Sequence, residues 1–160
     1  MIAELPSATE FSFVRRPVPV PGDLRIAWRL PVILLMLAMS RGKRASLAKL
    51  HILNGALRSS VGRVRLSNIV TSATPASSWQ IRVEPALGRA IDFLIGAKLA
   101  QWTEVSKRIG LELTVSGTKA AEQLLKLDDA LNDEREFLKS VAGGVTEGLV
   151  SAVIGSRKVI

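Results

Sequence analysis

The sequence predicts a mainly α-helical protein with one small β-hairpin, arranged as a winged helix-turn-helix domain with an N-terminal arm and C-terminal helices. The first observation behind this prediction is compositional. Hydrophobic residues make up 48% of the chain and aromatic residues 4%, with no Tyr, a balance typical of packed aliphatic helices. The second is the order of patterns, in which three apolar helical repeats precede alternating residues at 109–115 and another helical repeat follows them. Helix, helix, helix, hairpin, helix is the order of a winged helix.

Three segments are expected along the 160 residues: an N-terminal arm at 1–22, the winged-helix domain at 23–131 and a helical extension at 132–160. Four prolines in the arm fix extended backbone and forbid a long helix. Asp23 can cap the first helix of the domain because its carboxylate accepts the free N–H groups of the first turn. Pro31 either kinks this helix or marks a late start. The apolar repeat of the helix consists of Leu24, Trp28, Val32, Leu35 and Met39.

The second and third helices are predicted from a cap and a proline. Ser46 is expected to cap a helix that reaches Val61 and carries Lys49 on its outer side. Between residues 64 and 80 the chain is rich in Ser, Thr and Ala, which is typical of a loop or a short edge segment. Pro85 suits the first turn of a third helix, which is expected to run from Glu84 or Pro85 to Ala97. The inward positions of these two helices are Leu47, Leu50, His51, Leu57 and Val61 in the second, and Leu87, Ile91, Leu94 and Ile95 in the third.

The hairpin is predicted from strict alternation of apolar and polar residues. One strand is expected at 99–105, a turn at 106–108 and a second strand at 109–115. The apolar residues of the second strand share one face because successive side chains point to opposite sides.

The C-terminal part of the chain is expected to be helical. Thr114 or Ser116 can cap a helix from about Gly117 to Leu131, followed by a helix at 133–141. Two glycines then interrupt the pattern before a short terminal helix or tail. The predicted buried face of the first of these helices consists of Ala121, Leu124, Leu125 and Leu127.

The residue types disfavour an enzyme. The chain has one His, no Cys and no Tyr, so a Ser-His-acid arrangement would need His51, which occupies a core-facing helical position. No phosphate-binding glycine loop is present, and the acidic cluster between Asp128 and Glu136 is more typical of a solvated helix face than of a metal site. We therefore expect no catalytic residues, no cofactor and no metal.

The location is expected to be cytoplasmic. The most apolar window, 30–39, has about half of the ~20 residues that a membrane-crossing helix needs. The first residues lack the basic region and apolar core of a secretion signal. No contact with a membrane is expected.

A basic, acid-free run is compatible with a negatively charged partner, and also with a net charge that only keeps the protein soluble through mutual repulsion. The chain carries a net charge of +8, and the run from Leu24 to Val83 has ten Arg or Lys residues and no Asp or Glu. Such a run can neutralise phosphates through counterion release or contact an acidic protein surface. Lys107 and Arg108 are expected at the tip of the wing, where a winged helix touches the DNA backbone. The other candidates in this set are Arg41, Lys43, Arg44, Lys49, Arg58, Arg63 and Arg65.

The predicted third helix is poorly suited to reading bases. It offers Arg89 and Lys98, but Asp92 repels phosphate and most other positions are apolar or small. Apolar outer positions favour burial against another protein. Trp79, Arg89 and Trp102 are the candidates for such an interface, the two tryptophans only if they are exposed, because either one can instead be an ordinary core residue.

Three stretches resemble the winged-helix middle component of bacterial ABC-three-component systems. They are RLPVILLMLAMSRGKRASLAKLHILNGALRS at 29–59, IRVEPALGRAIDFLIGAKLAQW at 81–102 and GLELTVSGTKAAEQL at 110–124. The resemblance covers roughly residues 24–130, and its most distinctive block is 41–59. These systems are antiphage operons related to Lamassu, in which an SMC-like ATPase works with an effector and a small accessory subunit.

The resemblance implies a cytoplasmic, non-enzymatic subunit that binds the ATPase and effector of its operon and helps to couple DNA sensing to effector release. It brings no catalytic residues to this chain. Two other functions stay open on the residues alone. One is a homodimeric winged-helix transcriptional regulator that reads a palindromic operator, and the other is a clamp that holds DNA without sequence preference.

Overall fold

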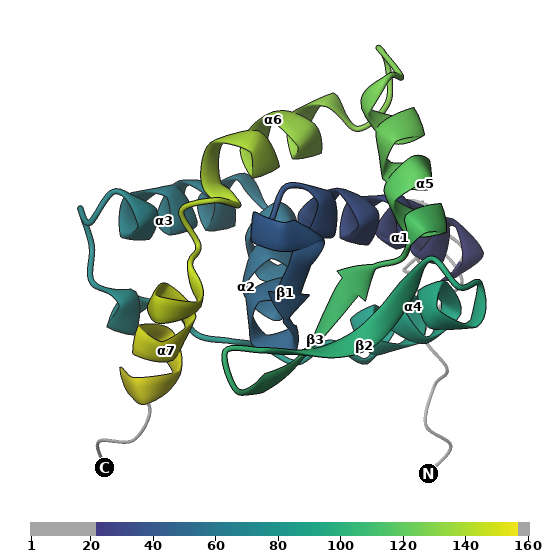
Figure 1. Cartoon of the computed structure of the whole chain (residues 1–160). Helices are drawn as coiled ribbons and strands as arrows, with labels where there is room; N and C mark the ends of the chain where they lie inside the picture. Colours follow the sequence, from purple (N-terminus) through teal and green to yellow (C-terminus); the bar gives the residue numbers. More distant parts are fainter. Residues whose placement is uncertain (1–21, 157–160) are drawn as a thin grey trace, which may run out of the picture.

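The computed structural model describes residues 22–156, which form a mainly helical protein with a small antiparallel sheet of three strands (Figure 1). The predicted arm at 1–22 lies outside the described residues, except for the backbone of Gly22. The side chain of Asp23, which was predicted to cap the first helix, also lies outside the described part. The elements in chain order are α1 (Gly22–Ala38), the 3-10 turn η2 (Arg41–Lys43), β1 (Arg44–Ser46), α2 (Leu47–Leu57), α3 (Ser60–Val70), the 3-10 turn η3 (Ala76–Ser78), α4 (Pro85–Gly96), β2 (Ala100–Val105), β3 (Arg108–Leu113), α5 (Val115–Leu125), α6 (Asn132–Val141) and α7 (Glu147–Gly155).

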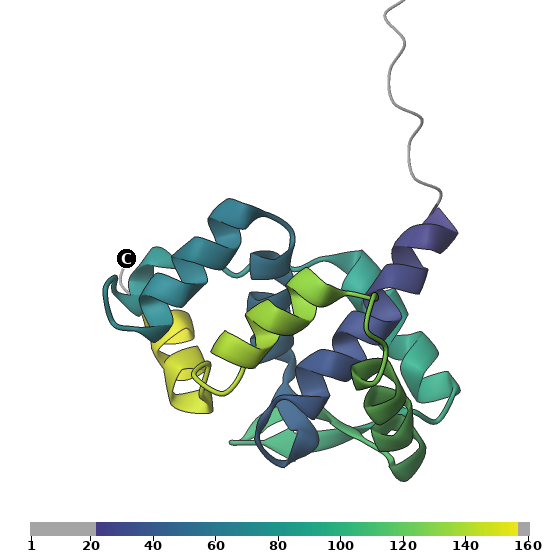
Figure 2. The same ribbon diagram turned by 90° about the horizontal axis from the view of Figure 1, so that it is seen from above.

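Helix α1 is the centre of the core. Residues 32–37 are all at most 5% exposed, and a helix that is apolar on every side must be surrounded by other elements. It contacts α2, α4, α5 and α6 as well as the sheet, while its N-terminal turns extend beyond the body (Figure 2). Since α1 begins at Gly22, Pro31 lies inside the helix and does not mark a late start.

The sheet has the order β1-β3-β2, with all pairs antiparallel. The hairpin was predicted, but the third strand, β1, was not. Ser106 and Lys107 form a two-residue turn with φ of 50° and 63°, the left-handed backbone that matches the twist of a tight hairpin. The predicted turn was one residue too long, because Arg108 already pairs with Val105. β2 begins at Ala100 and β3 ends at Leu113, inside the predicted strand limits.

Side-chain caps end or begin several helices as predicted. Ser46 Oγ accepts from Lys49 N at 3.2 Å, and Thr114 Oγ1 accepts from Gly117 N at 3.0 Å. Helix α4 begins at Pro85, also as predicted. These interactions satisfy N–H groups that a helix start leaves free.

Two helices differ from the prediction. The second helix ends at Leu57 instead of Val61, because Ser59 Oγ caps a new helix, α3, by accepting from Gly62 N at 3.0 Å. Residues 64–70 are therefore helical and not part of a loop. Val61, which was predicted to face inward, is 66% exposed. Helix α5 ends at Leu125 instead of Leu131, and Leu125 and Leu127 are 38% and 47% exposed although both were predicted to be buried.

Helices α6 and α7 bury their apolar sides in the same core as the preceding elements. Phe137, Leu138 and Val141 of α6, and Val150 and Val153 of α7, are at most 8% exposed and belong to one cluster with α1 and α2. The proposed segment boundary at 131/132 stays a prediction. Within residues 22–156, no helix combines the length and apolar character that crossing a bilayer requires.

Candidate functional site

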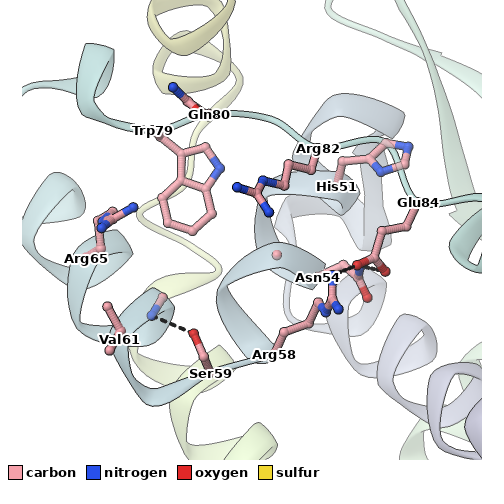
Figure 3. Close-up of a pocket in the computed structure, with 12 residues that line it drawn as sticks. His51, Asn54, Arg58, Ser59, Val61, Arg65, Trp79, Gln80, Arg82 and Glu84 are labelled. Carbon is pink, nitrogen blue, oxygen red and sulfur yellow. Dashed lines mark hydrogen bonds and ion pairs between the residues drawn. The ribbon is translucent and has the colours of Figure 1, made fainter. Parts of the chain in front are cut away.

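A pocket of about 380 Å³ lies where the end of α2, the start of α3 and the segment before α4 meet (Figure 3). Its wall is rich in arginine and has a single acidic residue. The side chains that define it are His51, Arg58, Arg65, Trp79, Arg82 and Glu84. We call it the arginine pocket.

The rigid wall of the arginine pocket is Trp79. This side chain is 7% exposed and lies against Gly55, where a Cβ atom would be 3.4 Å from Trp79 Cζ2. Gly55 therefore lowers the helix propensity of α2, but its missing side chain leaves room for the Trp79 indole. Trp79 was an interface candidate only if it was exposed. Because it is buried, it is an ordinary core residue.

Glu84 joins three elements at the pocket. Its carboxylate accepts hydrogen bonds from Asn54 Nδ2 at 2.9 Å and from Arg58 Nη1, and lies 2.9 Å from Arg29 Nη1. Burial opposes the charged form, but the Asn54 hydrogen bond and the charges of Arg29 and Arg58 outweigh it, so the pKa of Glu84 is lowered. Sequence reasoning treated Glu84 only as a helix start. The available signal was its position as the first acidic residue after the acid-free run.

His51 was predicted to face the core and is half-buried at the edge of the arginine pocket. Its Nδ1 atom is buried and has no hydrogen-bond partner among the described residues. Burial lowers the pKa of His51, and the negative charge of Glu84 opposes that shift in part. The imidazole is therefore neutral near pH 7, and the positive charge of the pocket comes from its arginines.

The predicted basic set does not share one environment. Arg41, Lys43 and Arg44 are exposed around η2 and β1, and Lys107 is exposed at the hairpin turn. Arg58 and Arg65 come together in the arginine pocket with Arg82, a residue that sequence reasoning did not select.

Lys49 was predicted to point outward, and this is wrong. Its side chain is buried, and Nζ donates to Ala142 O at 2.8 Å. That carbonyl belongs to the residue that ends α6, so the ammonium satisfies one of the free acceptors of a helix C-terminus. Burial lowers the pKa of Lys49, and Glu147 opposes the shift in part. Lys49 is not a surface cation.

Two further members of the basic set bind within the chain. Arg63 is half-buried and donates to Leu57 O at 3.2 Å. Arg108 is the first residue of β3 and lies next to the hairpin turn as predicted, but its guanidinium group donates to Glu147 Oε2 at 3.4 Å and to Ser151 Oγ. Glu147 also accepts from Ser46 N at 3.1 Å, so this carboxylate ties α7 to the sheet.

An apolar groove of about 420 Å³ lies between α1, α4 and α5. Phe93 of α4 is 58% exposed at this groove, and Leu127 is 47% exposed. Leu30, Leu34, Leu94 and Leu124 complete its apolar wall. Arg89 and Asp92 are the charged residues on the exposed side of α4, so the helix presents one positive charge, one negative charge and an aromatic ring.

Trp102 meets the condition set for an interface tryptophan. It is 46% exposed on β2, and Ile109 on the neighbouring strand is 60% exposed. Trp102 pairs with Leu111 and Glu104 with Ile109, so Trp102 and Ile109 share one face of the hairpin.

No group of three or more His, Asp or Glu residues in the described part of the chain has an arrangement that could hold a metal ion. Comparison of the chain with known protein families, with curated proteins and with solved structures finds no match.

Proposed function

We propose that this chain is a non-catalytic winged-helix accessory subunit of an SMC-like ATPase complex in antiphage defence, and that it bridges the ATPase and the effector. The proposal starts from the sequence resemblance over residues 24–130. The topology supports it, because a winged helix has a short strand after its first helix that completes the sheet with the hairpin. β1 and the order β1-β3-β2 fit that arrangement, with α4 in the position of the recognition helix and α3 as an addition.

The exposed side of α4 carries the functional argument. A DNA-reading helix presents Arg, Lys, Asn or Gln toward base edges, whereas α4 presents Asp92 and Phe93 beside its single Arg89. An exposed aromatic ring at the edge of an apolar groove is a typical anchor for a protein partner. We therefore place the ATPase contact at the groove between α1, α4 and α5.

Co-expression with the SMC-like ATPase and the effector of the same operon tests this function. A tagged wild-type chain should recover both proteins, and Phe93→Glu should fail to recover the ATPase, because a carboxylate cannot enter an apolar contact without losing hydration. Val64→Glu is the matched control, since Val64 on α3 is 61% exposed and does not line the groove. A wild-type chain that purifies alone, or equal recovery by both variants, would overturn the proposal.

A homodimeric DNA-binding regulator is the alternative function. The observation that favours it is the exposure of Arg89 on α4 and of Lys107 at the hairpin turn, two positions from which winged helices contact DNA. This function requires the wild-type chain to prefer a palindromic operator over random duplex by about a thousandfold or more at physiological salt. Equal affinity for operator and random duplex would exclude it.

A further inference from the structure

Some charged side chains of the arginine pocket are paired with other residues of the chain, and others are not. Glu84 is the one acidic residue of its wall, and its carboxylate is already bound by Arg29, Asn54 and Arg58. Arg65 and Arg82 are exposed, and neither guanidinium group has an ion pair or hydrogen bond with another residue in the described range 22–156. Two guanidinium groups therefore face the pocket with their charge uncompensated.

The two arginines come from different elements and are held near one rigid surface. Arg65 projects from α3, and Arg82 from the segment that leads to α4 (Figure 3). The Trp79 indole lies between them in this view, and it is buried. Both arginines line the same pocket, which therefore offers guanidinium donors from two different elements.

We propose that the arginine pocket binds a phosphate group, with Arg65 and Arg82 as the ligand-binding residues. The planar guanidinium donates two parallel hydrogen bonds to phosphate oxygens, a geometry that gives both strength and selectivity. A volume of about 380 Å³ holds a diphosphate or a single nucleotide. The phosphate belongs either to a small phosphorylated molecule or to a nucleic acid chain.

This site lies outside the apolar groove and does not depend on the ATPase contact. Its lining residues share none with the groove. A failure of phosphate binding therefore leaves the proposed accessory function standing, and a failure of ATPase recovery leaves the phosphate site standing.

Calorimetric titration of the full chain with pyrophosphate, ADP and a twelve-nucleotide single strand tests the proposal. The double variant Arg65→Ala/Arg82→Ala should weaken binding by at least about tenfold, because each lost charge-assisted contact is worth about that much. Lys119→Ala/Lys126→Ala removes the same charge from exposed residues outside the pocket and should change affinity by less than about twofold. Saturable binding of pyrophosphate and ADP identifies a small ligand, and saturable binding of the strand alone identifies a nucleic acid phosphate.

The three tryptophans allow a second measurement that does not depend on the variants. Their indole N–H signals in a proton-nitrogen correlation spectrum report on separate places, since Trp28 Nε1 donates to Glu134 and Trp102 lies on β2. The probe that binds saturably should shift the Trp79 signal and leave the other two unchanged. No saturable binding of any of the three probes, equal affinity in wild type and Arg65→Ala/Arg82→Ala, or an unshifted Trp79 signal would each overturn the proposal.

Discussion

The Glu84 carboxylate lies 2.9 Å from Arg29 Nη1, and this pair fixes the start of α4 to the middle of α1. Both side chains are largely buried, with exposed fractions of 14% and 13%. Arg29 Nη1 also donates to Asn54 Oδ1 at 3.0 Å, so the three side chains from α1, α2 and the start of α4 form a closed cluster. The relative position of these elements rests on a polar contact as well as on apolar packing.

Replacing this carboxylate should destabilise the fold. Glu84→Gln keeps the size of the side chain but leaves the Arg29 guanidinium buried without a counter-charge, which should lower the free energy of unfolding by about 2 kcal/mol. Urea unfolding followed by circular dichroism measures the loss. Glu104→Gln, at an exposed position of β2, is the control and should leave stability unchanged within about 0.5 kcal/mol. Equal stability of the two variants would contradict the role of the cluster.

The Glu84 contribution should vanish in acid. Because the pKa of Glu84 is lower in the folded chain than in the unfolded chain, the unfolded state binds the proton more readily. The stabilisation is complete above the ordinary pKa of a glutamate, about 4.3, and disappears as pH falls through the folded value. The gap in unfolding free energy between wild type and Glu84→Gln should therefore be constant from pH 6 to 7 and close at lower pH. A gap that does not depend on pH would rule out this linkage.

Lys49 should make stability rise with pH in the same direction as Glu84 does, but in the alkaline range. Burial lowers its pKa in the folded chain, so the folded state releases the proton first and gains stability as pH rises toward the ordinary lysine value of about 10.4. The unfolding free energy of wild type relative to Lys49→Met should increase between pH 7 and pH 10. Lys43→Met, at an exposed position, should show no such trend. A flat difference for Lys49→Met would mean that the ammonium is hydrated and not buried.

Gly110 should be irreplaceable at the contact between β1 and β3. A Cβ atom at this position would lie 2.5 Å from Ala45 O, so an alanine must push the two strands apart. Gly110→Ala should lower the free energy of unfolding by about 3 kcal/mol. Gly88→Ala is the matched control, because nothing lies within 4 Å of a Cβ there and alanine favours a helix, so that variant should gain about 0.5–1 kcal/mol. Similar stability for the two variants would show that β1 is not a fixed part of the sheet.

The elements that could be predicted are those whose cause lies within a few residues. Ser46 and Thr114 cap helices by reaching N–H groups three residues later, and Pro85 suits a helix start whatever surrounds it. The alternation at 109–113 reflects two faces of one strand, and it correctly predicted β3. Each of these signals depends on neighbouring residues alone and needs no contact with a distant segment.

The candidate sites could be predicted only in part. Exposure of Trp102 and of Arg65 agrees with their proposed roles, but Lys49 and Arg108 were assigned to the surface and bind inside the chain. The local conformational energy of a lysine on a helix is nearly the same whether its side chain points toward the core or toward solvent. The carbonyl of Ala142, far along the chain, decides its direction.

The sequence by itself determined the helical composition, the hairpin and most helix starts, because these depend on local caps, proline and side-chain alternation. Tertiary structure alone decided that the three residues of β1 form a strand, since their partner is β3, and that α3 is a helix, since Leu66 and Ile69 are buried in the core. It also brought Glu84 to Arg29 and Arg65 to Arg82. Local propensities differ by tenths of a kcal/mol, whereas burial of an aliphatic side chain contributes about 1.5–3 kcal/mol, so contacts between distant segments prevail wherever the two compete.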